Sequence, residues 1–339
     1  MEFFLQGTRE ALEFDKILSL INPCSCYGKV HKKSLIPYLP GYEKVLREEL
    51  AKVRESSRRI SGTKPEDWQR IQHLLAQVPD ISEEVSLLKN GLVLHEINFF
   101  NIKKFLYLVH GLAQLWKETK LFPEEYCQAL MPPGELDQEY LQKNTGYQFY
   151  LGDYGGEDYL RVQKEIKELS ARLTQAEKGG MNMLKQDLAW EDKLFTGKYI
   201  YVSSNDRERL AQALEHPLLE KHRDFGGEIC FARKVTPLEE ELEKSLQVKK
   251  QEEEALDLEI RKKLSELLKG YAGYFDHAQK ELGYADWLLA KAVFMGNFNC
   301  IVPQIQAGTA ICLEQGVNLN IRNDLAKVQK VFSPVSLDF

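Results

Sequence analysis

The sequence predicts a mainly α-helical protein with a long antiparallel helical pair and a small α/β insert. Apolar residues recur at steps of three and four along most of the chain, which is the pattern of amphipathic helices. Two such stretches, 157–192 and 237–282, are far longer than an average globular helix. Between them the pattern becomes β-rich at 198–203. We therefore expect a helical core, a pair of long helices and an insert that joins them.

Shorter helices are expected to precede the first long one, separated by Pro and Gly. They are predicted over 8–21, 42–58, 65–77, 80–89 and 95–119. The last of these is rich in Ile, Phe, Leu and Val, so we expect it at the centre of the core. A short extended piece is expected at 149–153.

The long helices and the insert are predicted from the middle of the chain. Gly179-Gly180 predicts a kink or break in the first long helix. Within the insert we expect strands at 198–203 and 226–232, and a helix over 206–222. Thr236 and Pro237 are suited to begin the second long helix. That helix would span roughly 70 Å, too long to stand alone, so the first is expected to lie antiparallel beside it.

The end of the chain is predicted to return to the core. A helix is expected over 283–298, followed by short strands at 301–303, 317–321 and 334–337. The expected division is as follows: 1–156 first part of the helical core, 157–192 first long helix, 193–236 α/β insert, 237–282 second long helix, 283–310 last part of the core, 311–339 short strands.

Composition places the chain among ordinary globular proteins. It is 43% hydrophobic and 28% charged, with a formal net charge of −6. A free-standing nucleic-acid binder usually carries a basic surface, so this charge argues mildly against strong DNA binding. The six Cys are scattered through a long chain, which favours free thiols in a reducing cytoplasm. Neither a signal peptide nor a membrane-spanning run is recognisable, so we expect a cytoplasmic protein with no membrane contact.

We find no residue set that predicts catalysis, a cofactor or a metal site. Cys24 and Cys26 with His31 offer three candidate ligands in one loop, but zinc sites favour a wider Cys spacing, so we favour a packed turn. The Asp and Glu residues lie mostly at helix positions where solvation and pairing explain them. The sequence thus predicts a protein that is not an enzyme.

The insert is the best candidate for binding. Between 193 and 234 there are eight Lys or Arg against six Asp or Glu, slightly basic in an acidic protein. Candidate contacts to a polyanion or a partner are Lys198, Arg207, Arg209, Lys221 and Arg223. Backbone contacts to DNA need such residues. A normal mixed surface explains them equally simply, and we favour that interpretation.

Several runs, taken in order, resemble the core, lever and clamp of the MutS family. KYIYVS at 198–203 resembles the first clamp strand, and RKVTPLEEEL at 233–242 the start of the returning lever helix. LGYADWLLA at 282–290 is similar to the run that closes the core, and NCIVP at 299–303 follows as in that family. ALEFDKIL at 11–18 resembles the opening of the second bacterial MutS class. The resemblance covers nearly the whole chain, although no single motif is very specific.

The departures from the family are as informative as the resemblance. MutS proteins continue into an ATPase with a Gly-rich phosphate loop, and no Gly-x-x-x-x-Gly-Lys-Ser/Thr occurs in this sequence. By the resemblance, that domain would be expected to begin near residues 334–339, and no segment of this sequence resembles the family's mismatch-reading domain. The lone Phe-x-Glu at 122–124 falls in the helical core, and the basic-His-Pro signature reads Arg-Asn-Asp at 322–324. The resemblance therefore implies that a separate chain supplies the ATPase.

Two functions follow from the resemblance. The first is a non-catalytic scaffold subunit that works with a separate MutS-type ATPase. It resembles the KamB-type accessory subunits of systems that reactivate adenosylcobalamin-dependent lysine aminomutase, so an aminomutase is a further expected partner. The second is the DNA-binding core and clamp portion of a mismatch repair or recombination protein, which the acidic charge disfavours. An independent enzyme has no residue set behind it, and homo-oligomer formation stays open.

Overall fold

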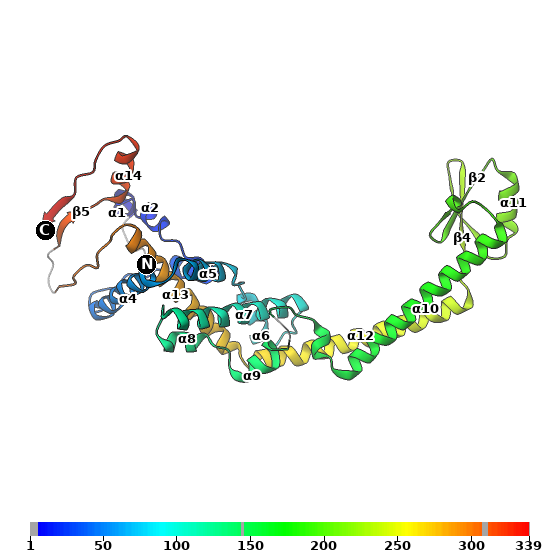
Figure 1. Cartoon of the computed structure of the whole chain (residues 1–339), viewed down its shortest axis with the longest axis horizontal. Helices are drawn as coiled ribbons and strands as arrows, with labels where there is room; N and C mark the ends of the chain where they lie inside the picture. Colours follow the sequence, from blue (N-terminus) through cyan, green and yellow to red (C-terminus); the bar gives the residue numbers. More distant parts are fainter. Residues whose placement is uncertain (1–5, 144–145, 307–310, 339) are drawn as a thin grey trace. The chain divides into compact units, whose positions relative to one another are not determined.

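The computed structural model describes residues 6–143, 146–306 and 311–338, and it confirms a mainly α-helical fold. The chain divides into two compact units: residues 1–149 with 263–339, and residues 150–262. The second unit is therefore inserted in sequence between two parts of the first. Figure 1 labels most helices of both units, together with strands β2, β4 and β5.

The helices of the first unit follow most of the predicted boundaries. They are α1 (Gln6–Ala11), α2 (Phe14–Ser19), α3 (Cys26–Lys33), α4 (Glu43–Gly62), α5 (Pro65–Gln77), α6 (Ser82–Lys89), α7 (Glu96–Thr119), α8 (Glu124–Leu130), α9 (Gly134–Leu136) and α13 (Ala272–Asn297), with a π-helical turn η1 (Asp137–Leu141). The single helix expected over 8–21 is wrong. Glu13 adopts a left-handed conformation with φ 47°, which separates α1 from α2.

Helices α7 and α13 form most of the buried core of the first unit. Eleven residues of α7 are buried, among them Phe105 and Trp116, as its apolar composition predicts. α13 buries twelve residues and contacts α3, α4, α6 and α8. Both helices are apolar around most of their circumference, which is typical of helices with neighbours on several sides.

Asp286 of α13 holds the turn that precedes α3. Its carboxylate accepts hydrogen bonds from the backbone N–H of Cys24 (3.0 Å) and from both the N–H and the hydroxyl of Ser25 (2.7 Å each). The Ser25 hydroxyl in turn accepts from the N–H of Gly28 (3.0 Å) and caps α3. Burial raises the pKa of Asp286, and the bonds from Ser25 and Cys24 oppose that rise.

The second unit contains a helix of 33 residues, the first 26 residues of a second long helix, a shorter helix and a small sheet. Its elements are the 3₁₀ turn η2 (Leu151–Tyr154), α10 (Gly156–Leu188), the 3₁₀ turn η3 (Asp192–Leu194), β1 (Phe195–Thr196), β2 (Tyr199–Ser203), α11 (Arg207–Glu215), β3 (Leu219–Phe225), β4 (Glu228–Arg233) and α12 (Pro237–Lys269) up to residue 262. The extended piece expected at 149–153 is wrong, because η2 occupies most of it. α10 is uninterrupted through Gly179 and Gly180, so the predicted break there is also wrong.

Helices α10 and α12 lie side by side and antiparallel. Glu165 forms an ion pair with Lys249 (2.7 Å), and the Gln163 amide donates to Glu253 (3.3 Å). Farther along α10, Gly180 lies against Arg233, which precedes α12. As the residue number rises along α10, from Glu165 to Gly180, the number of its neighbour falls, from Lys249 to Arg233. The two helices therefore run in opposite directions. Figure 1 shows the two helices running together up to the sheet.

The long helix predicted over 237–282 is two helices. α12 ends at Lys269 and α13 begins at Ala272. Gly270 lies between them, and glycine costs about 1 kcal/mol in a helix interior relative to Ala. The apolar spacing continues through Leu267, Tyr271 and Tyr274, so periodicity alone did not indicate the end.

The last part of the chain contains β5 (Cys312–Gly316), α14 (Leu319–Lys327) and β6 (Val335–Asp338), with β5 antiparallel to β6. The strand expected at 334–337 is confirmed, whereas no strand forms at 301–303. The strand expected at 317–321 is wrong. The Asn318 side chain accepts hydrogen bonds from the N–H groups of Asn320 (3.0 Å) and Ile321 (3.1 Å), which starts a helix there.

Candidate functional site

The insert at the ends of α10 and α12 is a four-stranded antiparallel sheet with one helix. The strand order is β1-β2-β4-β3. Both sequential hairpins turn on two residues: Gly197 and Lys198 link β1 to β2, and Gly226 and Gly227 link β3 to β4. Gly226 and Gly227 both have positive φ, as tight hairpins require. The helix predicted over 206–222 ends at Glu215, because Pro217 cannot continue it and β3 follows.

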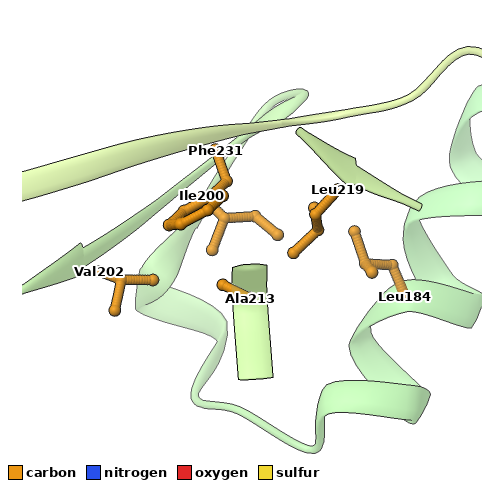
Figure 2. Close-up of a cluster of buried hydrophobic side chains, with 6 residues drawn as sticks. All are labelled: Leu184, Ile200, Val202, Ala213, Leu219 and Phe231. Carbon is orange, nitrogen blue, oxygen red and sulfur yellow. The ribbon is translucent and has the colours of Figure 1, made fainter. Parts of the chain in front are cut away.

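One face of the sheet is covered by α11 and the end of α10. Figure 2 shows the cluster of buried side chains that the sheet and these two helices form together, and Leu184 of α10 is part of it. The cluster consists of Leu184, Ile200, Val202, Ala213, Leu219 and Phe231. α10 therefore contributes to the insert's core, since Leu184 is fully buried there. Trp190 strengthens the junction, because its indole N–H donates to Gln212 of α11 (3.0 Å).

The opposite face of the sheet carries aromatic side chains. Ile200 pairs with Phe231 on the covered face, so Tyr199 and Tyr201 on β2 point to the other side. The ring of Tyr199 lies 5.2 Å from that of His222 on β3. Strand register places Cys230, which pairs with Tyr201, on this side too. The face combines aromatic rings with polar groups rather than forming a uniformly charged surface.

A buried ion pair fixes the insert to the start of α12. The Arg233 guanidinium donates to Glu239 (2.5 Å), and their side chains are 7% and 2% exposed. Glu239 also accepts from the N–H of Thr236 (2.8 Å), while Glu239 N–H donates to the Thr236 hydroxyl (3.3 Å). Thr236 and Glu239 thus form a capping box, and Pro237 occupies the first helical position as the sequence predicts. We call Arg233, Thr236 and Glu239 the latch.

Glycine on α10 makes room for the latch. A Cβ atom at Gly180 would lie 2.6 Å from Arg233 Nη1, whereas one at Gly179 would meet nothing within 4 Å. Burial would raise the pKa of Glu239, but the hydrogen bonds from Arg233 and Thr236 outweigh it, so its pKa is lowered. Glu239 is therefore ionised at neutral pH and pairs with the charged Arg233.

The structure does not gather the five predicted basic residues into one patch. Lys198 lies in the β1–β2 turn, and its carbonyl accepts a hydrogen bond from the N–H of Arg233. It therefore lies at the end of the sheet that leads into α12. Arg207 opens α11 after β2 has crossed the sheet. Register puts Lys221 on the face of Phe231 and Arg223 on the face of Cys230, with a bulge between them. The candidate contacts therefore point in several directions.

Two of the five basic groups are already paired. Lys221 forms an ion pair with Asp224 (2.9 Å). Arg209 lies 3.6 Å from Asp206 and 3.9 Å from Glu191. In the second unit, which is described throughout, the side chains of Lys198, Arg207 and Arg223 have no acidic partner. These three exposed cations are the groups that a polyanion could contact.

Cys24, Cys26 and His31 take part in packing. Burial raises the pKa of each of the two thiols to about 11, so both are neutral at pH 7. Cys26 Sγ lies 3.8 Å from the Val78 carbonyl, and the His31 ring lies 5.8 Å from that of Tyr284. Within the described ranges we find no group of three His, Cys, Asp or Glu side chains arranged to hold a metal ion.

Sequence reasoning missed the latch and the role of Gly180. A Thr with Glu three residues later is the signature of a capping box, so Thr236 and Glu239 could have been paired in advance. No local signal links Arg233 or Gly180 to them. Their contact depends on α10 and α12 lying together.

Comparison with known proteins assigns no family. No family model matches the chain, and no curated protein matches it in sequence. Among the described helices none is both long and apolar enough to cross a membrane.

Proposed function

We propose that this chain is a non-catalytic, MutS-like scaffold subunit that works with a separate MutS-type ATPase. One observation carries the proposal: two helices, α10 and α12, run antiparallel and are closed at one end by a small α/β insert. This is the lever and clamp arrangement that the motif resemblance implies. The buried latch supports it, since it fixes the insert to α12.

The helical pair is suited to transmit movement. α10 has 33 residues, which corresponds to about 50 Å of helix. Helices move as rigid elements in switching proteins, so a displacement at one end is carried to the other. We propose that ATP-driven closure of the partner is passed through these helices to a client, and that the client is an adenosylcobalamin-dependent lysine aminomutase.

The partnership is tested with the full chain and a MutS-type ATPase from the same organism. We expect the two to co-elute in size-exclusion chromatography and the chain to change the rate of ATP hydrolysis. Arg233→Gln should weaken the change in rate without abolishing co-elution, because it loosens the insert only. Separate elution together with an unchanged rate would refute the partnership.

The client is tested separately. A lysine aminomutase that has lost activity through damage to its cobalamin is incubated with ATP and both proteins. We expect turnover to recover only when both proteins and ATP are present. Equal recovery without this chain would exclude the reactivation role but leave the ATPase partnership standing.

A DNA-binding function is a second candidate, favoured by the three exposed and unpaired cations of the insert. If it holds, the chain binds a DNA duplex and affinity falls steeply with salt, by a log–log slope of about −0.9 for each phosphate contacted. Arg207→Gln and Arg223→Gln should each make that slope shallower. Absence of salt-dependent binding would eliminate this candidate.

A further inference from the structure

Two adjoining cavities lie on the first unit, beside the ends of α4 and α7. The larger, about 540 Å³, is lined largely by charged side chains, and we call it the basic cavity. The smaller, about 300 Å³, is lined mostly by apolar groups, and we call it the apolar cavity. They share Glu55, Arg59 and Phe122 in their walls, so they lie next to each other. Each lies in the size range of small-molecule sites, about 300–1,000 Å³.

The basic cavity has an excess of positive charge. It is lined by Arg58, Arg59, Lys117 and Lys120 against Glu55 and Glu124. Arg58 and Arg59 share the single carboxylate of Glu55 (2.9 and 2.8 Å), and the side-chain bonds from these two arginines hold the pKa of Glu55 below its usual range. An excess of two positive charges in a protein of net charge −6 is a local reversal of sign.

The apolar cavity lies on the other side of Arg59 and Phe122 from the basic cavity, and its walls are mostly apolar. Leu121, Phe122, Pro123 and Tyr126 form one wall, and Leu288 of α13 contributes to another. Phe122 is fixed by packing, since its ring lies 4.6 Å from that of buried Trp116. Arg59 stands at the boundary, and its Nη1 also donates to the carbonyl of Lys120 (3.4 Å). A ligand with its anion beside Arg59 could therefore place an apolar body against Phe122.

A purely structural role also explains part of the charge. Arg59 lies in the last turn of α4 and Lys117 in the last turn of α7, where cations favour the helix dipole. The helix-dipole role does not explain why an apolar cavity adjoins these cations. It also does not explain Lys120, which lies beyond the end of α7. It also gives no reason for these cations to bind a small anion.

We propose that these cavities form one binding site for a small amphipathic anion, a phosphate or carboxylate carried on an aromatic or aliphatic body. The anion is held by Arg58, Arg59 and Lys120, and the body fills the apolar cavity. The site is independent of the scaffold function proposed above.

The test uses 8-anilinonaphthalene-1-sulfonate, an aromatic anion whose fluorescence rises at apolar sites. It is titrated into the full chain, and we expect a saturable component that weakens with salt. Arg59→Gln and Lys120→Gln should each weaken that component about tenfold, the size expected for one charged hydrogen bond. Ala51→Phe, at an exposed helical position in the apolar cavity, should block it.

A matched control lies on the same helix. Arg54 is exposed on α4 and lines neither cavity, so Arg54→Gln should leave binding unchanged. Circular dichroism of each variant checks that the helices persist. Adenosine monophosphate and decanoate are then added as competitors, and the one that displaces the probe identifies the head group.

The outcomes are distinct. A saturable component that is about tenfold weaker in the Arg59 and Lys120 variants, lost in Ala51→Phe and unchanged in Arg54→Gln supports the site. Unchanged binding in the two charge variants overturns it, because the probe then occupies an apolar surface only. Displacement by neither competitor also overturns it.

Discussion

Helices α7 and α10 are both long, yet they are stabilised in different ways. α7 buries eleven of its 24 residues, whereas α10 buries three of 33, namely Tyr159, Val162 and Leu184. Those three lie near the two ends of α10, and none lies between them. α10 therefore has its fully buried residues near its ends, whereas its middle has half-buried apolar residues, such as Ile166 and Leu173, and surface pairs such as Glu165 with Lys249.

This difference teaches that stability is local in this molecule. A helix with many buried residues shares in a cooperative core, whereas an exposed helix can open in parts. The far end of the helical pair depends on the small core of the insert and on the latch. Substitutions in the insert's core or in the latch should leave the first unit folded. Substitutions in the packing around α13 should destabilise the first unit.

The largest effect is expected at the centre of the insert. Phe231→Ala removes a fully buried ring from a cluster of six buried residues and should cost about 3–5 kcal/mol, enough to unfold the insert. Hydrogen exchange should then become fast over the four strands and stay slow in α7. The control is Phe225→Ala, whose ring is 51% exposed and should matter little. Loss of protection in α7 would break the comparison.

A smaller but global effect is expected in the first unit. A Cβ atom at Gly28 would lie 2.2 Å from Asp286 Oδ2 and 2.7 Å from Pro23, so Gly28→Ala must separate α3 from α13. We expect a loss of about 1–3 kcal/mol in the free energy of unfolding. Gly273→Ala, which has open space on α13, should not destabilise. Denaturant titration followed by circular dichroism distinguishes them, and similar values for both would contradict the close packing.

The latch should contribute about 2 kcal/mol. Arg233→Gln leaves Glu239 without its charged partner, which costs less than in a deep core because both line a cavity of about 460 Å³. Glu239 has a lowered pKa in the folded chain, so its stabilisation is present above the unfolded carboxylate pKa and is lost as pH falls through the folded value. The difference between wild type and variant should therefore shrink in acid. A constant difference across that range would mean that the ion pair is not responsible.

The smallest effect compares two neighbouring glycines on α10. Gly179→Ala should stabilise the helix by about 0.5–1 kcal/mol, because Ala has the higher helix propensity and nothing lies near the new methyl group. Gly180→Ala should gain less or lose, because its methyl group must displace the Arg233 guanidinium. Thermal denaturation measures both. Equal gains would show that Gly180 does not make room for the latch.

The sequence by itself determined the helical class, the long helices and the position of the insert between them. These follow from the period of the apolar residues and from Pro and Gly, which are local properties. Pro65 and Pro237 mark true helix starts. The strand expected over 226–232 begins only at Glu228, because Gly226 and Gly227 form the hairpin turn. Periodicity failed where a local group overrode it, as at Gly270 and at Asn318.

Only the tertiary structure decided which groups meet. Asp286 and the turn at Cys24 are separated by 262 residues, and Gly180 meets Arg233 only because α10 and α12 lie together. The predicted basic residues shared a segment but not a surface, since alternate strand positions point to opposite faces and a bulge follows Lys221. The basic and apolar cavities unite α4, α7, α8 and α13. Short-range patterns do not encode such contacts, because long-range packing brings these groups together.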